Sequence, residues 1–471
     1  MSLAWLTSLC DFPGRRWLAW GLMLPFALPA YVLAFVFLGL FDFAGPVQDG
    51  LRSLFGLPLS WSIEIRHPFG VLLVLSLVLY PYVYLLARTA FLAQGRCTYE
   101  AARSLGLSPW ASFWQVSLPM ARPSMIAGLS LALMEALADF GAVSIFNFDT
   151  FTTAIYKTWF GLFDLQTAAQ LASLLLLLVL IALFLEQYSR GRARFLQPAF
   201  ATQHRLPLRG LTAGLASIYA WGIFVLAFAL PVGQLAWWAW ESRALLDISY
   251  LTLLWHTVSL GVIAAMLTVF GAFILAFAHR QQNSWGIRTS IRVGTLGYAL
   301  PGSVLAVGVM LMLTWLDQRI ADVVLWLTGA DPALFLTGTL AALLFAYFAR
   351  FLAVAFGPVE SALARLHPHL QEAGRSLGAS ATTLLRRVYL PILQPGLFAA
   401  ALLVLVDVMK EMPATLLLRP FGWDTLAVRI YELTAEGEWA RAALPALALV
   451  LMGLLPVLFL ERFARSAYQA K

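Results

Sequence analysis

Long apolar runs alternate with short polar segments along the whole chain. Each run is near the roughly 20 residues that an α-helix needs to cross the hydrocarbon core of a bilayer. The pattern predicts four spans before residue 190, at 17–41, 70–92, 124–146 and 168–185. It predicts six more after residue 210, at 213–238, 250–278, 293–315, 334–356, 396–416 and 442–460. The expected fold class is an all-α polytopic membrane protein with about ten spans, four plus six.

Composition agrees with lipid as the main solvent, because 61% of the 471 residues are apolar and 12% are charged. The formal net charge of +7 does not indicate nucleic acid, since the basic residues form short clusters between apolar runs. Arg15 and Arg16 precede the first run and Arg462 follows the last. The excess of basic residues on one side therefore predicts cytoplasmic N- and C-termini in a bacterial inner membrane.

One stretch occurs twice, at a constant offset of 272 positions. EAARSLGLSPWASFWQVSLP begins at Glu100, and EAGRSLGASATTLLRRVYLP begins at Glu372. Each copy predicts two short helices joined by a bend, with Gly106 or Gly378 in the left-handed conformation and Ser108 or Ser380 as a cap. Glu100 and Glu372 would lie at a helix start, where the dipole favours a carboxylate, and Pro119 and Pro391 would stop the second helix.

The two copies are similar to the EAA loop of binding-protein-dependent ABC importer permeases, with Gly374 in place of the third Ala in the second copy. That resemblance implies a type I importer fold of two parallel-repeat halves, with the loops at 98–122 and 368–395 docking on two separate ATPase subunits at the cytoplasmic side. The coupling residues it implies are Glu100, Ala101, Arg103, Gly106, Pro119, Glu372, Ala373, Arg375, Gly378 and Pro391. The alternative is that both loops only connect spans and do not dock on a partner.

The repeat also predicts the domain organisation. Residues 1–187 form a first half, the basic residues of 188–212 form a cytoplasmic linker, and 213–471 form a second half. Six spans separate the loops, an even number, so both loops face one side of the membrane. Fused members of the family have six spans per half, so either two spans precede Met1 or the first half lacks two peripheral helices.

Carboxylates inside predicted spans are costly and mark polar interiors. Glu135 and Asp139 are one turn apart, and at the 272 offset they correspond to Asp407 and Glu411. Tyr156 and Tyr431 follow at the external ends, and carboxylates with phenolates suit a hard cation such as Fe(III). These six residues are the candidate substrate path. The alternative is structural, with Asp139 and Glu411 paired to Lys157, Lys410 or Arg429.

The segments 137–161 and 410–432 resemble the fused ferric-iron importer permeases, which implies iron as substrate and a periplasmic or lipoprotein iron-binding protein as carrier. Other substrates of the wider group, thiamine, polyamine or aminophosphonate, stay open. No Gly-x-x-x-x-Gly-Lys-Ser/Thr motif occurs, so ATP and Mg would be bound by the partner ATPase and this chain would be no enzyme. A secondary transporter would not need two loops with a shared docking sequence, and a membrane enzyme would need catalytic residues that the sequence lacks.

Overall fold

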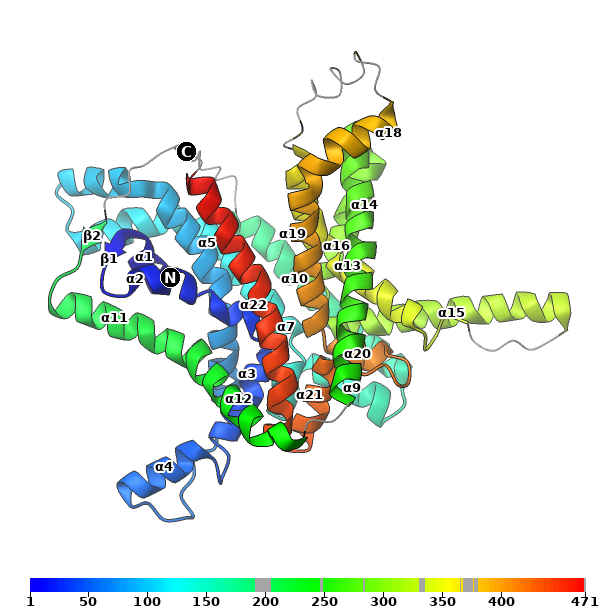
Figure 1. Ribbon diagram of the computed structural model, residues 1–471, viewed down its shortest axis with the longest axis horizontal. Coiled ribbons are helices and arrows are strands. Elements are labelled where there is room, and N and C mark those ends of the chain that lie inside the picture. Colours follow the sequence, from blue (N-terminus) through cyan, green and yellow to red (C-terminus); the bar gives the residue numbers. More distant parts are fainter. Residues whose placement is uncertain are drawn as a thin grey trace. The chain divides into compact units, whose positions relative to one another are not determined.

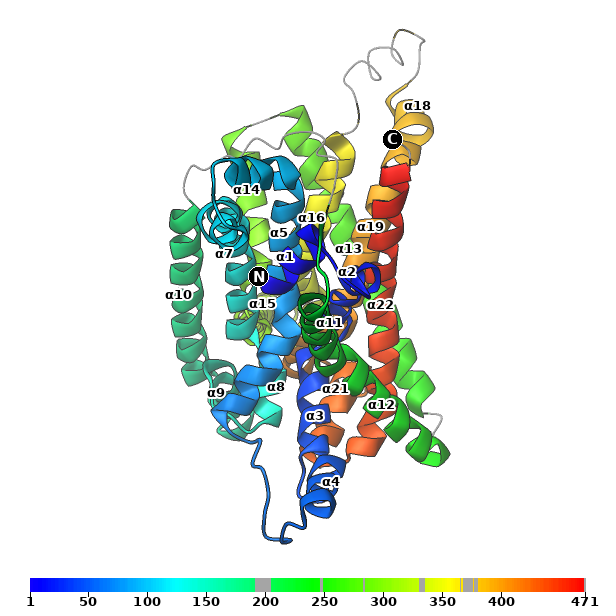
Figure 2. The ribbon, with the colours of Figure 1, turned by 90° about the vertical axis from the view of Figure 1, so that its left-hand side faces the viewer.

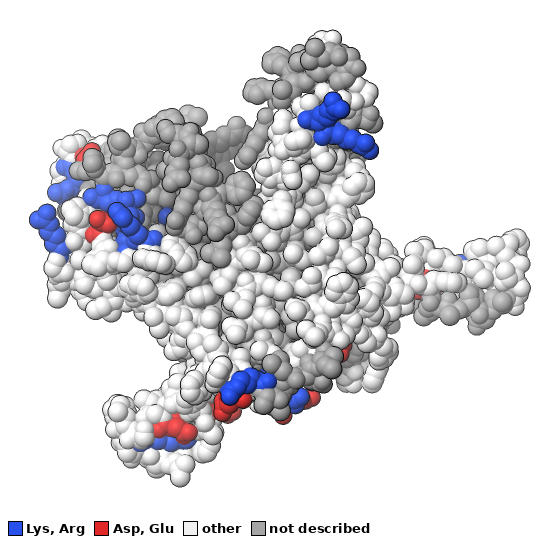
Figure 3. Space-filling model, viewed as in Figure 1, with Lys and Arg blue, Asp and Glu red and all other residues white. Residues whose placement is uncertain are grey.

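The computed structural model describes residues 1–190, 205–245, 249–282, 284–329, 335–364, 366, 376 and 380–469. Within these residues, nine helices are long and apolar enough to span a membrane, and one bent helix pair could supply a tenth span. The all-α polytopic fold class is confirmed. Figure 1 and Figure 2 show the helices from two sides, and Figure 3 shows that the charged side chains form a few separate groups on a visible face that is mostly uncharged.

The chain divides into two compact units, each built from segments that are not contiguous in sequence, and unit 1 contains both ends of the chain. Unit 1 contains residues 1–150, 177–243 and 437–471, and unit 2 contains 151–176 and 244–436. Leu211–Glu241, the first predicted span of the second half, thus lies in unit 1. The boundaries of the predicted repeat halves stay a prediction, and the linker residues 191–204 lie outside the described residues.

Unit 1 is built on the long helix α5, which packs against α1 and α7. Tyr84 of α5 is buried, donates a hydrogen bond to the Ala19 carbonyl at 3.0 Å and contacts the Thr7 hydroxyl at 3.0 Å. These bonds satisfy the phenol inside an apolar cluster that also holds Ala216 and Ala220. The elements of unit 1 are α1 (Ser2–Leu9), β1 (Cys10–Asp11), α2 (Arg15–Gly21), η1 (Leu24–Ala27), α3 (Ala30–Leu40), α4 (Pro46–Phe55), α5 (Pro68–Ser104), α6 (Pro109–Ser112), η2 (Phe113–Ser117), α7 (Leu118–Ala138), α8 (Gly141–Ile145), β2 (Leu206–Pro207), α11 (Leu211–Phe224), η4 (Val225–Ala229), α12 (Leu230–Glu241) and α22 (Trp439–Gln469).

Unit 2 is built on three helices, α13, α16 and α19, which pack on one another around an apolar core. Figure 1 shows α15 running crosswise to these three. The elements of unit 2 are α9 (Phe151–Tyr156), η3 (Lys157–Gly161), α13 (Ser249–Gln281), α14 (Trp285–Leu296), η6 (Gly297–Ala299), α15 (Gly302–Thr328), α16 (Leu340–Ala364), α18 (Ala381–Leu384), η7 (Leu385–Tyr389), α19 (Leu390–Lys410), α20 (Pro413–Leu418) and α21 (Leu426–Ala435). Two further elements, α10 (Leu165–Arg190) and η5 (Ser242–Leu245), each have residues in both units.

Two predicted spans are broken at equivalent prolines. The span predicted at 17–41 is a helix pair bent by 94°, and α3 begins only after Pro29. The span predicted at 293–315 begins after Pro301, and α15 then continues to Thr328 through residues predicted to form a polar external segment. Pro29 and Pro301 are 272 positions apart, and both are extended, with ψ of 145° and 140°. A proline with extended ψ cannot continue a preceding helix, which explains both breaks.

Candidate functional site

The first repeat stretch is the end of α5 rather than a separate helix. α5 continues without interruption from Pro68 to Ser104 and ends at a turn centred on Gly106, whose φ is +88°. The Leu107 amide donates to the Ala102 carbonyl at 3.2 Å, and the Arg103 guanidinium donates to the Leu107 carbonyl at 2.9 Å. Gly106 therefore closes the helix as predicted, and Arg103 holds the turn together.

The placement of Glu100 at a helix start is wrong. Because α5 does not restart there, Glu100 lies in the last turns of a 37-residue helix, where the dipole gives a carboxylate no support. Glu100 and Ala101 are exposed, and Ala102 is buried. Four coupling residues of the second copy, Glu372, Ala373, Arg375 and Gly378, lie outside the described residues.

The predicted stop at Pro119 is also wrong. The Ser108 hydroxyl caps the second helix by accepting the Ala111 amide at 3.1 Å, as predicted, but that helix continues through Pro119 to Ala138. A π-turn at Phe113–Ser117 precedes the proline, and the helix of the second copy repeats it at Leu385–Tyr389 before Pro391. The π-turn shifts the backbone hydrogen bonds just before the proline, which has no N–H to donate. The helix therefore continues past the proline without a break.

Apolar and charged side chains are exposed in the turn and in the helix that follows it. Leu105 is 83% exposed and Trp114 is 52% exposed, close in sequence to the exposed Glu100 and Arg103. An exposed apolar pair with charges beside it is the surface that a protein partner can cover. Beside the second copy, the Arg280 guanidinium donates to the carbonyls of Leu363 and Leu366 and so caps the end of α16. Arg280 follows the span predicted at 250–278, and the sequence gave no sign of this role.

Two equivalent helix breaks, one in each unit, carry carboxylates of the predicted path. α7 ends at Ala138 and α19 ends at Lys410, and the next residues, Asp139 and Glu411, are extended in both. Each carboxylate then caps the short helix that follows: Asp139 accepts the Val143 amide at 3.1 Å, and Glu411 accepts the Ala414 amide at 3.1 Å. The 272-residue correspondence of these two carboxylates is thus also a structural correspondence.

Glu411 forms a buried ion pair that the sequence did not predict. The Arg350 Nε lies 3.3 Å from Glu411 Oε2, and both side chains are buried. Arg350 also donates to the Leu300 carbonyl at 3.1 Å, at the break before α15. A Cβ on Gly302 would lie 2.4 Å from Glu411 Oε1, so the start of α15 packs directly on this pair. Glu411 therefore does not use the expected partners Lys410 or Arg429, and Arg429 pairs with Glu432 instead.

Glu135 and Asp407 lie in the last turns of α7 and α19, and both are partly buried. Each is thus one turn before the carboxylate at the helix break, as the spacing predicts. Glu135 and Asp139 belong to unit 1, whereas Asp407 and Glu411 belong to unit 2.

The two candidate tyrosines meet in unit 2. The rings of Tyr156 and Tyr431 pack edge to face with centroids 6.5 Å apart. Arg419 binds Asp424 and, at 2.8 Å, Glu432 nearby. Burial raises the pKa of Tyr156, and the positive charge of Arg419 opposes that rise. Within the described residues, no group of three or more His, Cys, Asp and Glu side chains could hold a metal ion.

Apolar spans, a repeated turn and equivalent helix breaks define a multi-pass membrane protein with an internal repeat. The sequence profile of the family described as binding-protein-dependent transport system inner membrane component matches residues 4–194. A putative 2-aminoethylphosphonate transport system permease of Salmonella typhimurium is 32% identical over 44% of this chain and 73% of its own length. The chain belongs to this family, and is a permease subunit of an ABC importer that works with ATPase and binding-protein subunits.

Two other relatives match almost the whole chain. An Fe(3+)-transport system permease of Haemophilus influenzae is 28% identical over 98% of this chain and 85% of its own length. A probable ABC transporter permease of Sinorhizobium fredii is 25% identical over 96% of this chain and 82% of its own length. The similarity therefore extends across both copies of the repeat.

Proposed function

We propose that this permease imports ferric iron delivered by a periplasmic or lipoprotein iron-binding protein. The observation that carries the proposal is the similarity to the Fe(3+)-transport permease over 98% of the chain. The aminophosphonate permease matches only 44% of the chain, and a probable sulfate permease of Marchantia polymorpha matches 39%. Those narrower matches support the shared permease role more than a shared substrate.

The chemistry of the candidate path favours a cation. Glu135, Asp139 and Asp407 bring carboxylates to the ends of α7 and α19, and hard cations prefer oxygen ligands. Phosphonate and sulfate are oxyanions, which are typically bound by guanidinium groups and backbone amides. The buried guanidinium at the helix break, Arg350, is already paired with Glu411. This arrangement supports iron over the oxyanion substrates.

Coupling would pass from the Gly106 turn to the membrane along α5. A continuous helix of 37 residues rises about 1.5 Å per residue, so α5 is a rod about 55 Å long. Two separate ATPase subunits would bind ATP and Mg at the cytoplasmic side, this chain would bind no cofactor, and both termini would be cytoplasmic. Movement of the ATPases would rock the helices attached to the two turns and alternate access to the path.

Uptake by the reconstituted permease with its ATPase and carrier tests the substrate. We expect ATP-dependent uptake of radiolabelled Fe(III) into proteoliposomes, with no uptake of sulfate or 2-aminoethylphosphonate. The variant Asp139→Asn should lower iron uptake per folded molecule, because it removes charge but keeps hydrogen-bonding capacity. Uptake of an oxyanion but not of iron would replace the substrate and leave the importer role intact.

A further inference from the structure

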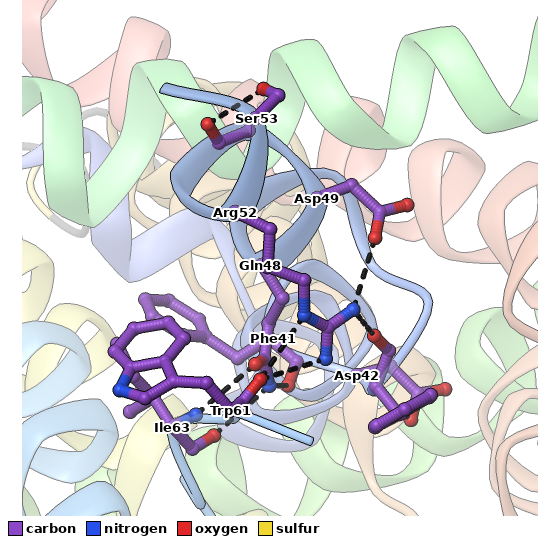
Figure 4. A network of polar contacts seen from close by, with 10 residues as sticks. Phe41, Asp42, Gln48, Asp49, Arg52, Ser53, Trp61 and Ile63 are labelled. Atoms are coloured by element: carbon purple, nitrogen blue, oxygen red, sulfur yellow. Dashed lines mark hydrogen bonds and ion pairs between the residues drawn. The ribbon is translucent and has the colours of Figure 1, made fainter. Parts of the chain in front are cut away.

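The segment between α3 and α5 folds with its polar groups inside. Gln48 and Arg52 of α4 are buried, and Figure 4 shows that they hold the returning chain. Gln48 donates to the carbonyls of Phe41 at 2.8 Å and Ile63 at 3.1 Å. Arg52 donates to the Phe43 carbonyl at 2.7 Å and through two nitrogens to the Trp61 carbonyl at 3.0 and 3.1 Å. We call residues 42–66 the first arm.

The apolar residues of α4 lie on a different face. Val47, Leu51, Leu54 and Phe55 form a stripe at helical spacing, beside the buried face of Gln48 and Arg52. Leu54 is 77% exposed and Phe55 is 66% exposed, so the stripe is not what folds the arm. In a water-soluble loop this arrangement would be reversed.

The second half repeats the exposed apolar residues of the arm but not its buried polar face, because Gln48 and Arg52 correspond to Ile320 and Val324. We call residues 318–328 of α15 together with 335–337 the second arm. Residues 318–327 of α15 are the 272-offset counterparts of α4, and Val323, Trp326 and Leu327 correspond to Leu51, Leu54 and Phe55. These three are 55%, 83% and 66% exposed. The returning chain is again fixed by a buried polar side chain, because Asp317 accepts the amides of residues 335–337 and the Thr337 hydroxyl.

We propose that the two arms lie on the bilayer surface, with their apolar stripes inserted at the boundary between headgroups and acyl chains. The first arm connects helix α3 directly to the span in α5, and Phe69 and Leu72 at the start of α5 are themselves 69% and 62% exposed. Exposed apolar side chains thus occur both on the arm and at the start of the span that follows it. An amphipathic helix at this position is what binds a membrane interface.

The direction of the two arms and their internal ion pairs favour lipid, rather than the carrier protein, as the partner of the apolar stripes. α4 leads away from the end of α3, and α15 leads crosswise away from α13, α16 and α19 (Figure 1). Each arm also contains an internal ion pair. Arg52 lies 3.1 Å from Asp49, and Arg319 lies 3.7 Å from Asp322. A carrier must cover the substrate path rather than a surface beside the helices. This inference does not depend on which substrate is imported.

Spin labels on the permease–ATPase complex in nanodiscs test the proposal. On a background with Cys10→Ala and Cys97→Ala, labels at Phe55→Cys and Trp326→Cys should contact dissolved oxygen and exclude a nickel chelate. Ser53→Cys and Gln318→Cys are the matched controls, since both residues are exposed on the same helices but outside the stripe. We expect nickel accessibility about tenfold lower at the stripe than at the controls, as for a helix in the interface.

Equal nickel accessibility at stripe and control positions would overturn the proposal. Protection that arises only when the binding protein is added would also overturn it and assign the stripe to the carrier. A measurement on the otherwise unmodified chain guards against folding defects in the cysteine variants. Lipids with brominated chains should quench wild-type fluorescence more than that of Trp326→Phe, and identical quenching would contradict lipid contact at Trp326.

Discussion

Arg350 and Glu411 lie 61 residues apart in the sequence, and their side chains meet at 3.3 Å inside unit 2. The pair connects three elements, because Arg350 is on α16, Glu411 is at the break after α19, and Arg350 also binds Leu300 before α15. The equivalent of Arg350 in the first half is Val78, so the first half does not repeat this pair. The two helix breaks share a geometry but differ in electrostatics.

Neutralising one partner of this ion pair should lower the stability of the fold. Glu411→Gln keeps the acceptor for the Ala414 amide but leaves the Arg350 charge buried without its carboxylate, so we expect a loss of about 3 to 5 kcal/mol of stability. The double variant Arg350→Gln, Glu411→Gln should lose less than the sum of the two single variants. Thermal unfolding in detergent measures both. Arg429→Gln is the control, and its more exposed pair should contribute less than about 1 kcal/mol. Additive losses would show that the two charges do not interact.

The Gly106 turn should be required for coupling. Gly106 has a φ of +88°, and a Cβ there would meet no atom within 4 Å, so a substitution acts through backbone strain alone. The double variant Gly106→Val, Gly378→Val should insert in the membrane but lose carrier-stimulated ATP hydrolysis. Gly106→Asn, Gly378→Asn is the matched control, because Asn tolerates the left-handed conformation. Wild-type stimulation in the valine variant would remove the coupling role from these turns.

Asp317 should fix residues 335–337 of the second arm against α15. Its carboxylate accepts three backbone amides and the Thr337 hydroxyl, and charged hydrogen bonds contribute about 1.5 to 3 kcal/mol each. Asp317→Ala should therefore raise hydrogen exchange at Phe335, Leu336 and Thr337 by at least about tenfold. Asp322→Ala, on the exposed side of the same helix, is the control. Unchanged exchange in Asp317→Ala would mean that other contacts hold the segment.

The tyrosine pair should make iron uptake depend on pH. If Tyr156 and Tyr431 bind Fe(III) as phenolates, each must lose a proton, and burial raises the pKa of Tyr156. Iron competes with that proton, so uptake should rise with pH throughout the range below the raised pKa. Tyr156→Phe, Tyr431→Phe keeps the ring contact and should flatten this profile at unchanged thermal stability. Tyr219→Phe is the control, and a pH profile that survives the double change would exclude the phenols.

The sequence by itself determined the features that depend on local pattern. Apolar run length gives the spans, and the 272-residue repeat gives two turns and the correspondence of Asp139 with Glu411. The turn at Gly106 was predictable because a helix end needs a residue that accepts positive φ. The breaks at Pro29 and Pro301 were not predicted, because the apolar runs at 17–41 and 293–315 were interpreted as continuous spans, although a proline inside such a run marks a probable helix boundary.

Tertiary structure decided what depends on distant neighbours. Pro119 looks locally like a stop, yet a π-turn and packing of α7 on α5 carry the helix past it. Arg350 was invisible as the partner of Glu411, because a buried charge pairs with whichever opposite charge the helices bring within reach, and sequence spacing does not encode that. The exposure of Leu54 and Phe55 likewise became evident only once Gln48 and Arg52 were seen to fill the inside of the arm. A hydrophobic pattern shows that a helix has an apolar face, but only the packed chain shows whether protein covers it.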